Sequence, residues 1–304
     1  MISQCTQLPH FVGLVTDLSP FLVRRALTSL RAELKFREEL LNAKGAKDLV
    51  TLEKSGDPDC PPSLVIVVDE FAALVTEVPE FVDGVVDVAQ RGRSLGLHLI
   101  LATQRPAGVI KDNLRANTNL RVALRMADTD DSRDVLGDPM AAHFPQDSPG
   151  RAAAKTGPGR ITVFQSAYPG AKTVEEIKTV SVDVEQLGFG VPKSWQTPEL
   201  PKPDDSVETD IKRVVTTLKS AAVTAGIPEP RKPWLPDLAQ TYDISKLYQR
   251  RDSELVLGVA DVPTKQAQVP EYFLPDKEGN IAYYGASGSG KTQALRSLAV
   301  AAAH

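Results

Sequence analysis

One segment, residues 285–292, constrains the possible fold of this 304-residue chain more than any other. Its sequence, GASGSGKT, satisfies the pattern G-x-x-x-x-G-K-[ST], and it lies between the strand-like run IAYY and a helix-forming tail. Glycines let such a loop wrap closely around phosphate, because backbone N–H groups and the start of the helix then face the anion. The segment therefore predicts a phosphate-binding loop at a strand-to-helix turn. The alternative is a chance glycine- and serine-rich turn.

The residue types in this loop predict how it binds ATP and Mg²⁺. Lys291 is expected to reach the β and γ phosphates, and the Thr292 hydroxyl is expected to ligate Mg²⁺. The residues expected to surround the nucleotide are Gly285, Ala286, Ser287, Gly288, Ser289, Gly290, Lys291 and Thr292.

A second candidate element is the run LVIVV at 64–68, which is followed by Asp69 and Glu70. Consecutive apolar, mostly β-branched residues are typical of a central parallel strand that is covered on both faces. An Asp at such a strand end can hold Mg²⁺, and the next Glu can orient and deprotonate the attacking water, as in a Walker B motif. The alternative is that both acids only cap the following helix.

Three polar residues accompany this strand. Gln104 ends the next apolar run, HLILAT, where a polar side chain can sense the γ-phosphate; the alternative is a solvated loop residue. Arg91 and Arg93 fall near the end of the helix before that run. In a ring, such an arginine can reach the nucleotide of the next subunit and stabilise the charge of the transition state. The alternative is a helix C-terminus that favours positive charge.

Composition excludes several classes of protein. The formal net charge of −4 gives no global attraction to nucleic acid, although residues 91–125 gather seven basic residues against one acid. Pairing of this stripe with acids of a neighbouring subunit is the alternative to a phosphate-facing surface.

Cys5 and Cys60 stand alone, which argues against a disulfide framework or a zinc site and favours a reducing, cytosolic setting. The apolar runs are too short to cross a bilayer, and the N-terminus does not resemble a signal peptide.

Caps and periodicities predict the order of the elements. A long helix is expected from Ser19 to Gly45, followed by a β-α-β unit that ends near residue 102. A strand is expected at 120–127, then a hairpin around Thr156-Gly157-Pro158-Gly159. The proline-rich stretch 191–205 is typical of a linker. Beyond it, we expect a helix at about 206–225, the strand ELVLGVAD, and a strand at IAYY.

Four segments of the chain resemble the ATPase core of the FtsK/SpoIIIE family: LPHFVGLVTDL, RALTSLRAEL, LVIVVDEFAAL and RGRSLGLHLILATQRP. The resemblance spans roughly residues 7–170 and resumes from about 255. It implies an α/β fold of the P-loop NTPase (RecA-like) class, with a mostly parallel sheet and flanking helices. It also implies that Asp69 is the Walker B aspartate, Glu70 the catalytic glutamate, Gln104 the sensor and Arg93 the trans-acting arginine.

The order of the motifs, Walker B before Walker A, predicts parts of two consecutive modules. Residues 1–185 are expected to be the later part of a first module, 186–254 a proline-rich linker with a helix, and 255–304 the start of a second module. Within the family, such a string of modules resembles the type VII secretion ATPases. A circularly permuted single domain is an alternative, but the linker and its helix would then interrupt neighbouring elements.

Three functions are compatible with this resemblance. The first is an ATP-driven motor that exports proteins, working in a ring with other copies or modules at the inner face of the cell membrane, where segments or partners outside this chain hold it. The second is a translocase of double-stranded DNA. The third is a remnant that binds nucleotide or partners without hydrolysis, because neither predicted module holds both Lys291-type and Glu70-type groups.

Overall fold

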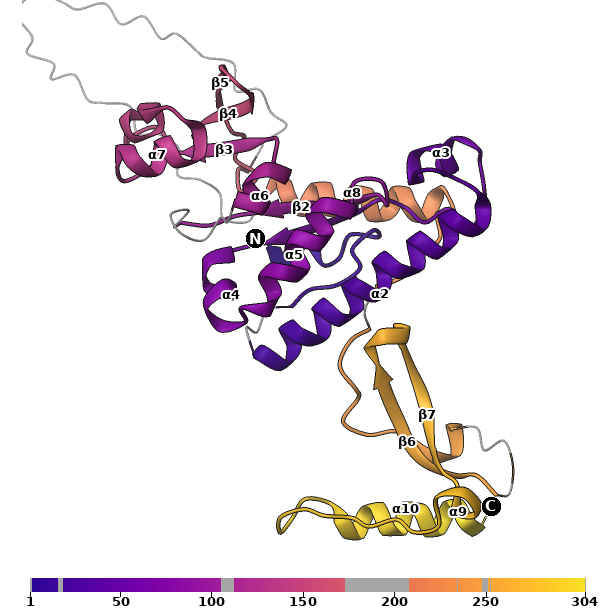
Figure 1. The fold of residues 1–304 in the computed structure, drawn as a ribbon. Coiled ribbons are helices and arrows are strands. Elements are labelled where there is room, and N and C mark those ends of the chain that lie inside the picture. The colour runs from indigo at the N-terminus through magenta and orange to yellow at the C-terminus, as the bar shows by residue number, and fades with distance from the viewer. Residues whose placement is uncertain are drawn as a thin grey trace, which may run out of the picture. The chain divides into compact units, whose positions relative to one another are not determined.

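The computed structural model describes residues 2–15, 19–104, 112–172, 208–233, 235–247, 251 and 253–303. These residues form two compact units. The larger unit comprises Val12–Phe164 and Pro230–His304, and the smaller unit comprises Met1–Phe11 and Gln165–Glu229. Figure 1 shows the elements of both, which are described separately here. Over the described part of the chain, none of the helices combines the length and the apolar character that crossing a membrane requires.

Helix α2 (Pro20–Lys44) is the longest element of the larger unit and confirms the predicted helix. The Ser19 hydroxyl accepts a hydrogen bond from the Leu22 N–H, and Gly45 ends the helix with a left-handed backbone at φ 64°. Both caps satisfy backbone groups that a helix leaves unpaired at its ends. The apolar residues recur on one face, which is buried; they include Val23, Leu27, Leu30, Leu34 and Leu41.

The predicted β-α-β unit is formed by β1 (Leu64–Val68), α4 (Phe71–Glu77), α5 (Glu80–Arg91) and β2 (Leu97–Leu101). Strands β1 and β2 are parallel, with Leu64 opposite Leu97 and Val68 opposite Leu101. The short helix α4 was not predicted. Two hydrophobic clusters join α2 and α5 to one face of this pair. Leu52 of α3 (Leu49–Lys54) belongs to the second cluster, together with Leu64 and Leu97 at the starts of the two strands.

The other face of the β1–β2 pair corrects the expectation of a strand covered on both faces. Val65 and Val67 alternate with the buried residues of β1, and their exposed fractions are 55% and 61%. Ile100 of β2 is 54% exposed. One face of this small parallel sheet is therefore open in the structure.

The next elements contain the predicted strand and the predicted hairpin, and they also include three helical segments that were not predicted. In chain order, the elements are α6 (Asp112–Asn117), β3 (Arg121–Leu124), α7 (Thr129–Leu136), the 3₁₀ helix η1 (Pro139–His143), β4 (Arg151–Gly157) and β5 (Arg160–Gln165). Strands β3, β4 and β5 form a sheet in that order, and β3 and β4 are antiparallel. Small residues allow α7 and η1 to pack closely on it, because Ala123, Ala141 and Ala153 are almost completely buried beside Leu136.

The final part of the larger unit is a hairpin followed by the loop and its helix. Strand β6 (Leu255–Val262) confirms the predicted strand, and it pairs through η3 (Pro263–Lys265) with β7 (Ala267–Phe273), which was not predicted. After α9 (Pro275–Glu278), the expected strand at 281–284 is not formed: the segment has no regular secondary structure and belongs to no sheet. A strand needs a hydrogen-bonded neighbour, and none of the described strands lies beside it. Helix α10 (Lys291–Ala303) then packs on β6.

A buried charge network ties this hairpin to α2. The Glu33 carboxylate accepts hydrogen bonds from Arg37 at 2.8 Å, Arg231 at 2.5 Å and the Gln266 amide at 3.0 Å. Its side chain is only 2% exposed. Gln266 reaches it from a left-handed backbone, φ 50°, which is strained for a residue with a side chain. Burial by itself raises the pKa of Glu33, but these hydrogen bonds and the arginine charges outweigh it and hold the pKa below its usual range.

A second ion pair fixes the same hairpin nearer the N-terminus of α2. Arg25 binds both oxygens of Asp261, at 2.5 and 3.0 Å, and it also donates to the carbonyl oxygens of Leu235 and Pro236. The hydrogen bond from Arg25 is the main reason that the pKa of Asp261 lies below its usual range. The carboxylates of Glu33 and Asp261 both accept hydrogen bonds from arginine side chains. The hairpin is therefore held to α2 largely by ionised acids.

The ionised carboxylates of Glu33 and Asp261 lead us to expect that acid lowers the stability of the larger unit. Groups with a depressed pKa in the folded state contribute stability above their unfolded pKa, about 4.3 for Glu and 3.9 for Asp, and lose it as the pH falls through the folded values. We therefore expect the urea midpoint to be flat from pH 7 to about 5 and to fall steeply below about pH 4. In the Glu33→Gln, Asp261→Asn double variant this acid-dependent loss should be smaller. An equally steep fall in the double variant would contradict the assignment.

The smaller unit contains α1 (Ile2–Cys5) and α8 (Asp210–Thr224), which pack against each other. Helix α8 confirms the helix expected at about 206–225. The proline-rich linker proposed at 191–205 and the boundary at 185/186 lie outside the described residues. A further 3₁₀ helix, η2 (Ile244–Lys246), belongs to the larger unit.

Candidate nucleotide-binding site

The loop at 285–292 has the backbone that a phosphate-binding loop requires. Gly288 and Gly290 have φ values of 76° and 90°, in a region that residues with a side chain rarely adopt. The Lys291 ammonium folds back over the loop and donates to the carbonyl oxygens of Gly285 and Ala286, each at 2.6 Å. Helix α10 begins at Lys291, so its first N–H groups face the loop. The Lys291 ammonium and the first turn of α10 therefore both lie at the loop, a combination that suits the binding of an anion.

The acidic turn after β1 is held in a strained conformation. Glu70 has φ 51° and ψ 55°, a left-handed backbone that costs about 1–3 kcal/mol and tends to persist at functional sites. Its N–H bonds the Asp69 carboxylate at 3.1 Å, and the Phe71 N–H donates to the Ala102 carbonyl at 2.8 Å. The turn is therefore anchored to the end of the neighbouring strand. Helix capping, the alternative for these acids, is not observed for Glu70, whose side chain makes no cap hydrogen bond.

The residues that follow β2 lie at the same end of the sheet as the acidic turn after β1. The Thr103 hydroxyl lies 3.4 Å from the Glu70 carboxylate, and Gln104 follows as an exposed residue. Because β1 and β2 are parallel, Asp69, Glu70 and Gln104 come together at one edge, as predicted. Thr103 was missed by the sequence analysis. Its position next to Gln104 at a strand end was the signal available.

The two arginines before β2 differ in their surroundings. Arg91 is paired with Asp87 at 2.5 Å and with Glu38 at 2.6 Å, and the hydrogen bond to Asp87 is the main reason that its pKa is raised. Arg93 is exposed in the turn that precedes Leu97, the first residue of β2. Arg93 therefore lies at the opposite end of β2 from Gln104. Within a single copy, it is not brought to Asp69 and Glu70.

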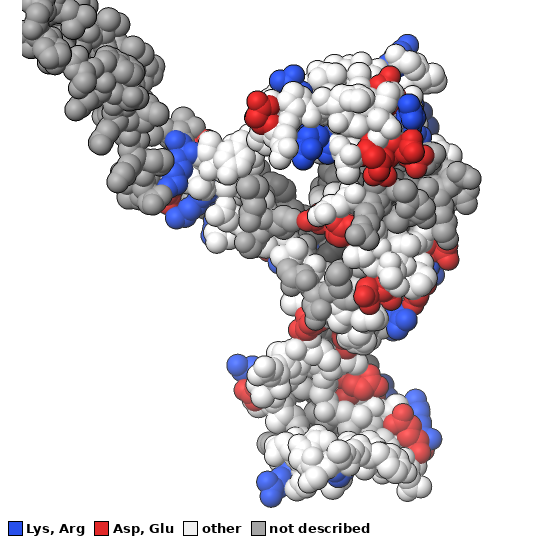
Figure 2. Space-filling model, turned by 90° about the vertical axis from the view of Figure 1, so that its left-hand side faces the viewer, with Lys and Arg blue, Asp and Glu red and all other residues white. Residues whose placement is uncertain are grey.

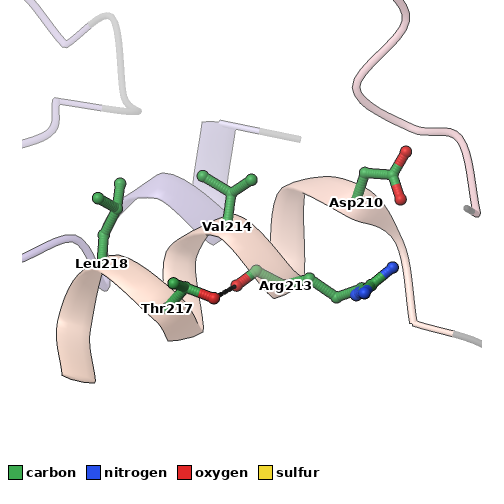
Figure 3. A pocket seen from close by; sticks show the side chains of 5 residues that line it. All are labelled: Asp210, Arg213, Val214, Thr217 and Leu218. Carbon is green, nitrogen blue, oxygen red and sulfur yellow. Dashed lines mark hydrogen bonds between the residues drawn. The ribbon is translucent and has the colours of Figure 1, made fainter. Parts of the chain in front are cut away.

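The basic concentration at 91–125 is only partly described, because Arg105, Lys111 and the side chain of Arg115 are outside the described residues. On the face drawn in Figure 2, acidic and basic side chains are interspersed over the described part of the chain. A groove along α8 is lined by Asp210, Arg213, Val214, Thr217 and Leu218 (Figure 3). All five come from one helix of the smaller unit, and none is a predicted site residue.

Within a single copy, the loop at 285–292 is separate from the acids Asp69 and Glu70. Among the described residues, no hydrogen bond or ion pair joins 285–292 to Asp69 or Glu70. The donor set nevertheless fits Mg²⁺, since a carboxylate and a hydroxyl with phosphate oxygens are the ligands this ion takes at nucleotide sites. No cluster of three or more His, Cys, Asp or Glu side chains that suits a metal occurs within the described ranges.

Comparisons with known proteins agree with the motifs. Residues 1–108 match the model of the FtsK/SpoIIIE family. The type VII secretion system protein EssC of Staphylococcus aureus (strain NCTC 8325) is 36% identical over 96% of this chain and 21% of its own length. The ESX secretion system protein EccC of Geobacillus thermodenitrificans is 33% identical over 96% of this chain and 20% of its own length. The chain thus spans about a fifth of these relatives.

Solved structures give the same result for the fold. The cytoplasmic domain of the type VII secretion ATPase EccC from Thermomonospora curvata superposes with a TM-score of 0.78 at 28% identity, over 98% of this chain and 33% of that one. A structure of EssC (ATPases 2 and 3) from Geobacillus thermodenitrificans has a TM-score of 0.67 at 18% identity and supports the fold alone. The α/β class is confirmed, and the chain belongs to the FtsK/SpoIIIE family.

Proposed function

We propose that the chain is a nucleotide-binding part of an FtsK/SpoIIIE-type motor ATPase that serves protein export by a type VII secretion system. The observation that carries the proposal is the loop at 285–292, where two left-handed glycines and the Lys291 ammonium form an anion-binding turn. Similarity to EssC and EccC over 96% of the chain supports the secretion branch.

The proposed chemistry follows from the residue types. In the second module the loop residues would hold the phosphates, Lys291 would neutralise the β and γ groups, and Thr292 would be a Mg²⁺ ligand; in the first module Asp69 would be a Mg²⁺ ligand, and the ion would supply further charge neutralisation at each site. Glu70 takes a proton from the attacking water while the water oxygen bonds the γ-phosphorus. The bond from that phosphorus to the bridging oxygen breaks, and ADP leaves with the electron pair. Gln104 orients the water or the γ-phosphate, and Arg93 acts on the nucleotide of a neighbouring subunit.

The arrangement of motifs supports two nucleotide sites rather than one. We assign residues 1–185 and 255–304 to two consecutive modules joined by 186–254. In one copy, the first supplies Asp69 and Glu70 without a loop and the second supplies the loop without acids. A single copy of this chain is therefore proposed to bind ATP without hydrolysing it.

The proposed partners are other copies or modules in a ring and exported proteins, at the inner face of the cell membrane through segments or partners outside this chain. Translocation of double-stranded DNA is the other sequence-based candidate, but no feature of the described surface favours it. The net charge is −4, and the charges on the face of Figure 2 are mixed.

Binding of ATP is expected to stabilise the larger unit. Mg²⁺-ATP at a hundredfold excess over its dissociation constant should raise the free energy of unfolding by about 2.7 kcal/mol, measured by urea denaturation. AMP lacks the phosphates that Lys291 would contact, so at equal concentration it should have little effect. Stabilisation by AMP equal to that by ATP, or none by millimolar ATP, would contradict the proposed function.

A further inference from the structure

The turn between α5 and β2, residues 92–96, is packed too closely to admit side chains at its two ends. At Gly96, whose backbone is left-handed at φ 68°, a Cβ atom would lie 2.2 Å from the Leu49 side chain. At Gly92, a Cβ atom would lie 2.9 Å from the Leu97 carbonyl oxygen. A larger residue at either position would require its surroundings to shift. The turn therefore has little room to rearrange.

Three successive carbonyl groups fasten this turn to the rest of the larger unit. The Ser94 oxygen accepts a hydrogen bond from the N–H of the first residue of α3 at 2.8 Å. The Gly96 oxygen accepts one from the N–H of the first residue of β1, also at 2.8 Å. Between them, the Leu95 oxygen accepts one from the Arg37 guanidinium at 2.9 Å. The middle of the turn is therefore held by a side chain, and the two flanking groups by backbone.

Arg37 reaches this carbonyl group from the interior of the protein. Its side chain is 4% exposed, and it also donates to the Pro62 carbonyl oxygen at 2.9 Å and to the Glu33 carboxylate at 2.8 Å. Pro62 lies two residues before β1, and Leu95 lies two residues before β2. One guanidinium thus attaches the starts of both strands to α2. A guanidinium can do this because its donors point in fixed directions, whereas a lysine offers one ammonium on a flexible stem.

The two exposed arginines at this turn differ in what holds their side chains. Arg91 is bound by Asp87 and Glu38, so its charge is already paired. The side chain of Arg93 makes no hydrogen bond or ion pair with any other described residue. A rigid backbone beneath an unpaired guanidinium reduces the entropy that is lost when the group binds a partner. Arg93 is therefore suited to bind a phosphate or carboxylate on another molecule.

We propose that Arg37 is a positioning residue for Arg93. Its buried guanidinium holds the Leu95 carbonyl group, and the turn thus fixed presents the Arg93 side chain in one direction to a phosphate of the nucleotide in a neighbouring subunit. Arg37 is buried and touches no nucleotide itself. The role of Arg93 rests on the proposed function, whereas the attachment of the turn to Arg37 does not.

NMR relaxation of the whole chain tests this attachment. In the wild type, the order parameter of the Arg93 backbone N–H should be about 0.85, the value of a rigid backbone. In the double variant Glu33→Leu, Arg37→Met, nothing replaces the donors to the turn, so the order parameter should fall to about 0.6 or show relaxation dispersion if the motion is slower. The N–H of Ala123, in β3, should give the same values in both proteins.

A destabilised control separates positioning from stability. Glu33→Gln removes a counter-charge but leaves Arg37 its bonds to the Leu95 and Pro62 carbonyl oxygens. It should therefore unfold at a lower urea concentration than the double variant and yet keep Arg93 as ordered as in the wild type. If Arg37 contributed only to stability, the order of Arg93 would be the same in all three folded proteins.

Two outcomes keep this inference apart from the proposed function. Equal order parameters and relaxation dispersion at Arg93 in the wild type and the double variant would overturn the positioning role and leave ATP binding standing. Failure of ATP to stabilise the wild type would reject the proposed function and leave the attachment of the turn to be judged by NMR. Arg37→Lys, which keeps the charge but lacks the fork, should loosen Arg93 as well, and it decides the question if the double variant does not fold.

Discussion

Lys291→Ala is expected to weaken the binding of Mg²⁺-ATP about a hundredfold, because the ammonium makes charge-assisted hydrogen bonds to phosphate worth about 1.5–3 kcal/mol each. In the structure the ammonium already lies over the loop, 2.6 Å from the Gly285 and Ala286 carbonyl oxygens. Little rearrangement is therefore needed for it to meet a phosphate. Isothermal titration calorimetry of the chain with ATP measures the change directly.

The substitution should leave the fold intact, since Lys291 is the first residue of α10 and alanine has the highest helix propensity. Lys277→Ala on α9 is the matched control: its side chain is exposed and lies outside the loop, so ATP affinity should not change. If the two variants bound ATP equally well, the loop would not be the nucleotide site.

Features with strong local signals were predicted well from the sequence. Ser19 and Gly45 mark the ends of α2, and the predicted β-α-β unit, the strand β3 and the hairpin of β4 and β5 are observed. In the candidate loop at 285–292, two of the glycines that define the motif, Gly288 and Gly290, have positive φ values. In each case a few neighbouring residues determine the backbone, so the pattern is visible in a single sequence.

Features that depend on distant partners were not predicted. The segment 281–284 has strand-like residues but no ladder, because pairing is a property of two segments. The open face of β1 was missed for the same reason: LVIVV indicates a buried strand, yet the coverage of Val65 and Val67 depends on other elements. The strained backbone of Glu70 and the contact with Thr103 arise from the strand register, which the sequence implies only once β1 and β2 are paired.

The burial of Glu33 on α2 could not be predicted from the spacing of apolar residues either. Glu33 lies between Ala32 and Leu34 in α2, and its partners Arg231 and Gln266 lie 198 and 233 residues further along the chain. No local pattern indicates that such a glutamate is buried. Its burial makes it the position in α2 where the loss of one charge should matter most.

Glu33→Gln is expected to lower the free energy of unfolding of the larger unit by about 3–5 kcal/mol, the usual cost of removing one partner from a buried ion pair. The side chains of Glu33 and Arg37 are only 2% and 4% exposed, so the remaining guanidinium could not recover its hydration. Arg37 would keep its bonds to the Leu95 and Pro62 carbonyl oxygens but would lose its counter-charge. Urea denaturation at pH 7 measures the effect.

Two further variants separate charge from packing. Glu39→Gln on the same helix should change stability by less than about 0.5 kcal/mol, because its pair with Lys35 is exposed and screened by solvent. Replacing both members of the buried pair, Glu33→Leu with Arg37→Met, should recover much of the loss, since apolar side chains of similar size need no counter-charge. If Glu33→Gln cost no more than Glu39→Gln, the hairpin would be held by its apolar contacts, and the acid sensitivity expected of the larger unit would have to come from Asp261 alone.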